Sequence, residues 1–175
     1  MIEYAVRRLK EELSSSASDL SEFFGRDVVA VPVPSRSLIP ADGLWVPKRI
    51  ATALAVQGLV GTVRPVLRRT RAIPKSAFAA PGQRPALEIH LDSLELTETE
   101  GLARERFLLI DDVVTKGTTL FACGVKVREA FPGAELAAFA LLRTRGLVSE
   151  IERIIDPCRG RIYRDVERDE PRRDP

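Results

Sequence analysis

Residues 107–133 restrict the fold of this chain more than any other stretch. They begin with four consecutive apolar residues, Phe107-Leu108-Leu109-Ile110, a run of strand length without a polar face. Such a run is typical of a strand buried on both sides. Two acidic residues follow, and a helix is predicted from about residue 118 to 131, stopped by Pro132-Gly133. A buried strand, a short loop and a helix in this order form the repeating unit of a parallel sheet covered by helices.

Other apolar runs predict the remaining strands. Residues 28–33 are rich in valine and end in alternating prolines, which cannot donate to a sheet ladder. Residues 136–142 predict another buried strand, and we expect two more within residues 59–67 and 86–91. Strands that alternate with helices indicate an α/β fold with a mainly parallel sheet flanked by helices.

Two helices precede or interrupt these strands. Ile2, Val6 and Leu9 recur at helical spacing and predict an N-terminal helix over residues 1–14. Pro47 suits the first turn of a second helix, because proline lacks the amide that this turn leaves unbonded. A length of 175 residues fits one domain with its own core.

Composition predicts a cytoplasmic protein without a membrane span. No apolar segment reaches the length that crosses a bilayer, and the charged N-terminus does not resemble a signal peptide. Cys123 and Cys158 match neither a CxxC pair nor a zinc spacing, so we interpret them as reduced thiols. The net charge of +2 argues against nucleic acid without excluding it, because basic residues cluster between Arg64 and Lys75.

The residues after the 107–110 run combine three features of a phosphosugar site. Asp111 and Asp112 offer carboxylates to sugar hydroxyls, and Gly117 lets the backbone approach a ligand closely. The amides that open the following helix form a cradle for a phosphate group. Side chains that add hydroxyls or positive charge to this cradle are Thr115, Lys116, Thr118 and Thr119. The alternative interpretation is a buried strand whose two acids cap a helix and bind nothing.

The segment FLLIDDVVTKGTTL, residues 107–120, resembles the signature of type I phosphoribosyltransferases that binds phosphoribosyl pyrophosphate (PRPP). The basic residue before Gly-Thr-Thr is similar to the glutamine PRPP amidotransferase form of that signature. The resemblance implies a type I phosphoribosyltransferase fold with a small hood. It also implies that Asp111 and Asp112 hold the ribose hydroxyls, while residues 115–119 hold the 5′-phosphate.

Two further segments acquire roles from this resemblance. Val-Pro-Val-Pro-Ser-Arg, residues 31–36, is similar to the VPVP segment of ComF-like phosphoribosyltransferases, which implies that Ser35 and Arg36 contact pyrophosphate. Without the signature, the same segment would be a stiff strand exit with an exposed arginine. Residues 68–84 stand where the family has its flexible catalytic loop. We predict Lys75 as the catalytic residue of this loop, beside Asp111 and Asp112, and leave Arg71 and Arg84 as alternatives. His90, the only histidine, is expected to be packed or on the surface.

We expect one domain over residues 1–175, with a core over 25–145 and a C-terminal segment, 146–175, that serves as hood or tail. Arg143 and Arg145 follow the strand at 136–142, where they could bind a phosphate or a base or start a surface loop. The acceptor site stays unassigned, because neither a glutaminase domain, nor a cysteine-rich zinc module, nor the Arg-Gly-Phe-Asn stretch of ComF proteins is recognisable.

The resemblance implies an enzyme that displaces pyrophosphate from PRPP with a nitrogen nucleophile, with Mg²⁺ carried on the substrate phosphates rather than on direct protein ligands. The alternative is a regulator without catalytic activity that binds PRPP or a nucleotide, or a ComF-like protein that contacts nucleic acid or a protein partner. A homodimer is left open.

Overall fold

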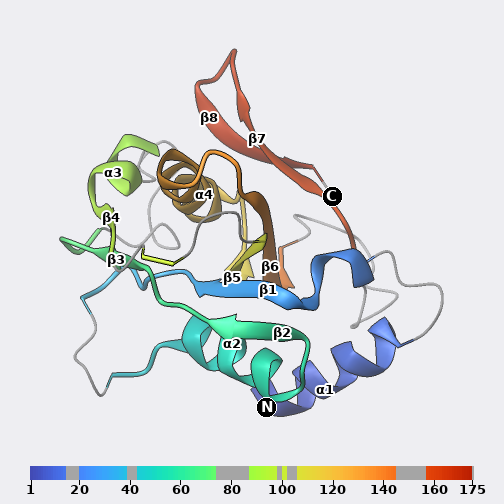
Figure 1. Cartoon of the computed structure of the whole chain (residues 1–175). Coiled ribbons are helices and arrows are strands. Elements are labelled where there is room, and N and C mark those ends of the chain that lie inside the picture. The colour runs from blue at the N-terminus through green and yellow to red at the C-terminus, as the bar shows by residue number, and fades with distance from the viewer. Residues whose placement is uncertain are drawn as a thin grey trace.

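Four parallel strands form the central sheet of the computed structural model (Figure 1). Their order is β2 (Val60–Val63), β1 (Gly25–Pro32), β5 (Arg106–Val114) and β6 (Glu135–Arg143). The structure describes residues 1–14, 20–38, 43–73, 87–97, 100–101, 106–144 and 157–174. The fold is α/β with a parallel sheet flanked by helices, as the sequence predicts.

Helices cover both faces of the sheet. Helices α1 (Ile2–Leu13) and α2 (Val46–Val56) lie along one face, and α4 (Thr118–Ala130) lies on the other (Figure 1). All three helices are close to their predicted positions, and Pro47 stands in the first turn of α2. A 3₁₀ turn, Ser21–Phe23, leads into β1. No helix in the described part of the chain is long and apolar enough to span a membrane.

Alternating side chains of β1 and β5 build two separate cores. Val28 and Leu108 point toward α1 and α2, where they pack with Ile50 and Leu54. Val29 and Phe107, one residue along each strand, point to the opposite face and pack beneath α4. Because both faces are covered, these strands are apolar throughout, which explains the continuous run at residues 107–110.

A small antiparallel ribbon stands beside the sheet. It pairs β3 (Leu67–Arg69) with β4 (Leu94–Leu96), and the short helix α3 (Leu87–Asp92) precedes β4. The strand predicted within residues 86–91 is therefore wrong. Leu87 and His90 are buried while Glu88 and Ile89 are exposed, so the burial follows a helical period that the short apolar run did not reveal.

The strand predicted at 136–142 exists as β6, but it is not fully buried. It lies at the edge of the sheet, most of its side chains are half-buried, and Leu142 is 61% exposed. An edge strand has a neighbour on one side only, so an apolar sequence there does not guarantee burial.

The end of the described chain forms a hairpin of β7 (Arg161–Asp165) and β8 (Glu170–Asp174). It rises from the sheet beside α4, in red in Figure 1, and β8 contacts α4. Within the 146–175 segment expected as hood or tail, residues 161–174 thus form a folded element. Residues 146–156 lie outside the described ones.

Candidate functional site

The predicted site residues that belong to the 31–36 and 107–120 segments lie at the carboxyl ends of β1 and β5. The chain leaves β1 toward β2 on one side and leaves β5 toward β6 on the other, so the strand order reverses between them. In open parallel sheets, this switch point is where a crevice forms and ligands bind. The amide of Val33, just after β1, donates to the carbonyl of Ile110 at 2.8 Å. The segments that follow the two strands therefore start side by side.

Asp111 and Asp112 lie inside β5 rather than after it. The sequence predicts that the strand ends at residue 110, yet β5 continues to Val114, because β6 runs beside it and pairs as far as Arg143. The β-branched Val113 and Val114 favour this extension. On the other side, β1 pairs no further than Ile110, so both carboxyl groups lie beyond the end of β1.

Both carboxyl groups accept hydrogen bonds from the backbone. The Asp112 amide donates to Oδ1 of Asp111 at 2.9 Å, and the Val113 amide donates to Oδ1 of Asp112 at 2.8 Å. In each carboxyl group the second oxygen accepts no backbone amide, and the two side chains interact with each other.

Asp111 is the most perturbed acid of the site. Burial raises its pKa to about 7, and the side chain of Asp112 acts in the same direction, while the positive charge of Arg36 lowers it. Arg36 follows β1, and its carbonyl accepts the amide of Ile73 at 3.0 Å. The charge of Arg36 therefore acts on Asp111, 75 positions later in the printed sequence. An acid that titrates near neutral pH beside a cation is a recurrent feature of functional sites.

Residues 115–117, which we name the 115–117 loop, join β5 to α4. Gly117 has a φ of 86° and is the N-cap residue of α4. A residue with a side chain would be strained at this φ. Because glycine has no side chain, no side-chain cap bonds the first amides of α4. Thr118 and Thr119 are half-buried in the first turn, while Thr115 and Lys116 are exposed.

The C-terminal hairpin lies against this loop, which the sequence did not predict. Lys116 Nζ donates to both carboxylate oxygens of Glu170, at 3.1 and 2.9 Å. The Ile162 side chain lies over Gly117, within 2.8 Å of the place where a Cβ atom would stand. The charge of Lys116 is therefore paired with a carboxylate in this structure.

Of the remaining residues predicted for the site, one lies after β1, one lies with the antiparallel ribbon, and three lie outside the described residues. Ser35 is half-buried after β1, and its hydroxyl accepts the Ser37 amide at 3.4 Å. Arg71 pairs with Asp92 of α3 at 3.5 Å, which keeps it with the antiparallel ribbon. Lys75, Arg84 and Arg145 lie outside the described residues.

The sequence did not predict a buried polar cluster that lies next to the site. Arg69 is 6% exposed and donates to the Ser93 hydroxyl and to Nδ1 of His90, the latter at 3.3 Å. Burial and the Arg69 charge lower the pKa of His90 to about 4, so its ring is neutral, which agrees with the packed role predicted for it. Within the described part of the chain, Arg69 Nε has no hydrogen-bond partner. The alternation of β3 could have predicted that Arg69 is buried, because Arg69 lies on the same side of the strand as the apolar Leu67.

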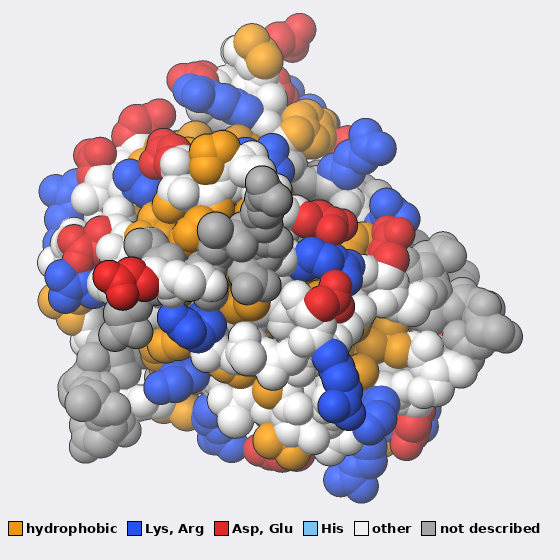
Figure 2. All heavy atoms as spheres, in the orientation of Figure 1, with side chains coloured by type: hydrophobic (Ala, Val, Ile, Leu, Met, Phe, Trp, Pro, Cys, Tyr) orange, Lys and Arg blue, Asp and Glu red, His pale blue; other side chains and the backbone are white. Residues whose placement is uncertain are grey.

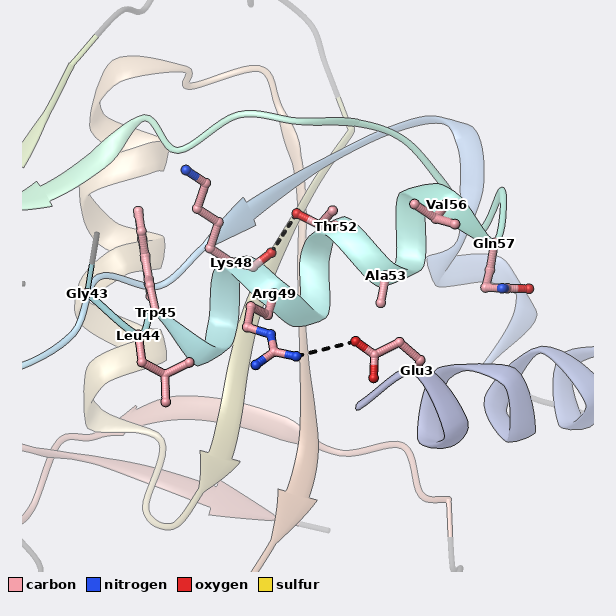
Figure 3. A pocket seen from close by; sticks show the side chains of 10 residues that line it. All are labelled: Glu3, Gly43, Leu44, Trp45, Lys48, Arg49, Thr52, Ala53, Val56 and Gln57. Atoms are coloured by element: carbon pink, nitrogen blue, oxygen red, sulfur yellow. Dashed lines mark hydrogen bonds and ion pairs between the residues drawn. The ribbon is translucent and has the colours of Figure 1, made fainter. Parts of the chain in front are cut away.

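A surface cavity of about 580 Å³ lies along α2, and none of the predicted site residues lines it. Glu3 of α1 and Arg49 of α2 form an ion pair at its rim, at 3.4 Å, and Trp45 forms one end (Figure 3). We assign it no role in the site at the ends of β1 and β5.

Charge on the face seen in Figure 2 is mixed. Lys and Arg side chains are interspersed with Asp and Glu over the described part of this face. Arg68 pairs with Glu95, so part of the basic cluster between Arg64 and Lys75 is neutralised locally. Among the described residues, no group of three His, Cys, Asp or Glu side chains could hold a metal ion.

Comparisons with known proteins add little to this geometry. No protein-family model matches the chain, and no curated protein matches it. Among solved structures, it is similar to a purine phosphoribosyltransferase from Pyrococcus horikoshii Ot3, at 15% identity and a TM-score of 0.41. That similarity covers 88% of this chain and 92% of the other. At these values the similarity carries no argument about function.

Proposed function

We propose that this protein is a phosphoribosyltransferase that binds PRPP in the crevice between β1 and β5. The reaction would transfer the phosphoribosyl group to a nitrogen acceptor and release pyrophosphate. The observation that carries the proposal is the order of groups along β5 and α4. A carboxyl pair, a loop with a left-handed glycine and an uncapped helix start follow one another at the switch point of the sheet.

The carboxyl pair suits the ribose ring. Asp111 and Asp112 each have an oxygen beyond the one that accepts a backbone amide, and a carboxylate oxygen accepts readily from a sugar hydroxyl. Negative charge at this point would also favour the positive charge that develops on the ring as pyrophosphate departs.

The start of α4 suits the 5′-phosphate. Unbonded amides at a helix N-terminus attract anions, and the hydroxyls of Thr115, Thr118 and Thr119 would add donors. Lys116 would contribute charge once it exchanges Glu170 for the phosphate.

Residues after β1 suit the pyrophosphate. The charge of Arg36 acts on the Asp111 carboxyl group, so we place its guanidinium near a ribose held by that group. Its guanidinium offers paired donors to a diphosphate, and the Ser35 hydroxyl would add another. We assign Lys75 to the developing negative charge of the leaving group, together with closure of the loop that contains it.

Magnesium would bind together with the substrate, through the substrate phosphates. Mg²⁺ binds few protein ligands and keeps waters or substrate phosphates. Among the described residues no group of three His, Cys, Asp or Glu side chains could hold it, and Asp111 and Asp112 are the carboxyl groups that would face an ion carried on the substrate phosphates. When bound, the ion would neutralise phosphate charge. We further propose a cytoplasmic location, with a homodimer still open.

A regulator that binds PRPP without turnover is the second candidate. The contact between Lys116 and Glu170 favours it, because a ligand that displaces Glu170 would change the position of the C-terminal hairpin. Pyrophosphate release upon addition of a base separates the two candidates, since a regulator would bind PRPP and release none.

Calorimetric titration with PRPP, with and without Mg²⁺, tests the site. We expect binding that Mg²⁺ strengthens, and we expect the Asp111→Asn/Asp112→Asn variant to lose it. The matched control is Glu88→Gln/Glu129→Gln, which removes two exposed carboxylates from α3 and α4. Equal affinity in both variants would contradict the assignment. Screening of bases for pyrophosphate release then follows.

A further inference from the structure

The C-terminal hairpin holds the one cation of the 115–117 loop. Both carboxylate oxygens of Glu170 accept from Lys116 Nζ, 54 positions away in the sequence. The two side chains are 46% and 44% exposed, so water reaches the ion pair. Exposed ion pairs contribute little stability, and an anion of higher charge can replace the carboxylate.

The hairpin also covers the loop with an apolar contact. Ile162 packs against the core beneath α4, and three of its side-chain carbons lie within 3.0 Å of the Cβ position of Gly117. Gly117 is buried as a result, although it starts a helix next to the predicted ligand crevice. The loop is therefore closed by one weak polar contact and one small apolar contact.

The hairpin has internal contacts that do not depend on the loop. Arg172 pairs with Asp165 at 3.4 Å, Arg164 donates to Asp169 at 2.8 Å, and the Tyr163 hydroxyl donates to Asp174 at 3.4 Å. β7 and β8 are also joined by their ladder, so the hairpin keeps its own shape when its contacts with the loop break. Arg173 donates to the carbonyl of Thr144 at 2.5 Å and ties β8 to the end of β6, so release concerns the part of the hairpin over the loop.

We propose that the hairpin is a latch on the 115–117 loop, released when a phosphate monoester replaces Glu170 at Lys116. This inference rests on the proposed function. A phosphate monoester carries more negative charge than a carboxylate, and the start of α4 favours it further. Binding of the 5′-phosphate is thereby coupled to movement of residues 161–174.

Two variants separate the latch from a general charge effect. Glu170→Gln removes the partner of Lys116, whereas Asp169→Asn removes the neighbouring carboxylate, which pairs with Arg164 inside the hairpin. Asp169 has a φ of 50°, a conformation that asparagine tolerates well. Both variants therefore lose one negative charge from neighbouring positions of the hairpin, and only Glu170 touches the loop.

Hydrogen exchange without ligand gives the first readout. We expect faster exchange at residues 115–118 and 161–174 in Glu170→Gln than in Asp169→Asn or the unaltered protein. PRPP titration gives the second readout. Because the ligand no longer competes with a carboxylate, we expect Glu170→Gln to bind PRPP about two- to fivefold more tightly, with Asp169→Asn unchanged.

The outcomes distinguish failure of the latch from failure of the proposed function. Equal PRPP affinity in all three proteins overturns the latch and leaves the PRPP site intact. Absence of PRPP binding in all three proteins overturns the proposed function. It also overturns release of the latch by a phosphate, which depends on that function. Weaker binding by Glu170→Gln also overturns the latch, because Glu170 would then assist the ligand rather than compete with it.

Discussion

The Ile162 side chain occupies the space beside Gly117 where any other residue would place its Cβ atom, with Cδ1 2.8 Å from that position. Gly117 also has a φ of 86°, which side chains rarely tolerate. Two independent constraints, backbone conformation and the overlying hairpin, therefore require glycine at this position.

Replacing Gly117 by alanine separates the two constraints. We expect Gly117→Ala to lower the free energy of unfolding by about 1–2 kcal/mol from the left-handed backbone alone, and by more while Ile162 remains in place. Ile162→Ala has its own loss of packing, so Gly117→Ala is compared within that background, where it should cost the backbone part alone. Urea denaturation measures both. Gly133→Ala is the control, because a Cβ there meets no atom within 4 Å and its stability should hardly change. Equal stability of Gly117→Ala and Gly133→Ala would contradict the assignment.

Asp111 is predicted to destabilise the folded protein at neutral and higher pH. Its folded-state pKa is about 7 against an ordinary 3.8, so the folded protein binds more protons between these values. Stability from this group therefore falls as pH rises from about 4 to 7. Asp111→Asn should not lose this stability, and its free energy of unfolding at pH 8 should exceed that of the unaltered protein by about 2 kcal/mol. This gain is smaller than the full pKa shift implies, because solvent reaches the side chain.

Thermal or urea unfolding at pH 4 and pH 8 tests this difference. The gain of Asp111→Asn should shrink toward zero at pH 4. His90 has a lowered pKa of about 4 and costs stability as pH falls below 6.5, but it does so in both proteins and cancels. Asp92→Asn, an exposed carboxylate on α3, serves as control. A gain that does not vary with pH would mean that Asp111 is not buried as an acid.

Local patterns in the sequence predicted the existence of the central strands better than the residues at which those strands end. The run at residues 107–110 identified β5, because strands covered on both faces must be apolar throughout. The same rule could not reveal that β5 continues through Asp111 and Asp112, since this depends on β6 lying alongside. The strand predicted within residues 86–91 was wrong, because the six residues of α3 are too few to separate a helical from a strand period.

Contacts over the candidate site depend on tertiary structure alone. Val33, just after β1, does form a hydrogen bond with Ile110 of β5, so the chain segments beyond these two residues start side by side. The sequence could not pair Lys116 with Glu170, because exposed charges in a segment dense in Arg, Asp and Glu have many equivalent partners. The packing of Ile162 on Gly117 likewise requires the hairpin to be placed first.

Affinity for PRPP should depend on the protonation of Asp111. A carboxylate accepts from a ribose hydroxyl more strongly than a neutral acid, and a pKa of about 7 raises its ionised fraction about tenfold between pH 6 and 8. We expect PRPP affinity to rise by up to that factor over this range. Calorimetry at several pH values measures it. Asp111→Asn should retain only the pH dependence of the PRPP phosphates, whose second ionisation lies near pH 6; identical profiles would exclude Asp111 from the site.

Arg36 should influence both the ligand and Asp111. Removing its charge by Arg36→Met eliminates paired donors to pyrophosphate, each charged hydrogen bond contributing about 1.5–3 kcal/mol, so PRPP affinity should fall at least tenfold. The loss of positive charge should also raise the pKa of Asp111, and the pH at which binding strengthens should move upward with it. Arg68→Met is the matched control, because Arg68 is exposed and pairs with Glu95 on the antiparallel ribbon. Weaker affinity with an unchanged pH profile would mean that Arg36 contacts PRPP without acting on Asp111, whereas the control should change neither quantity.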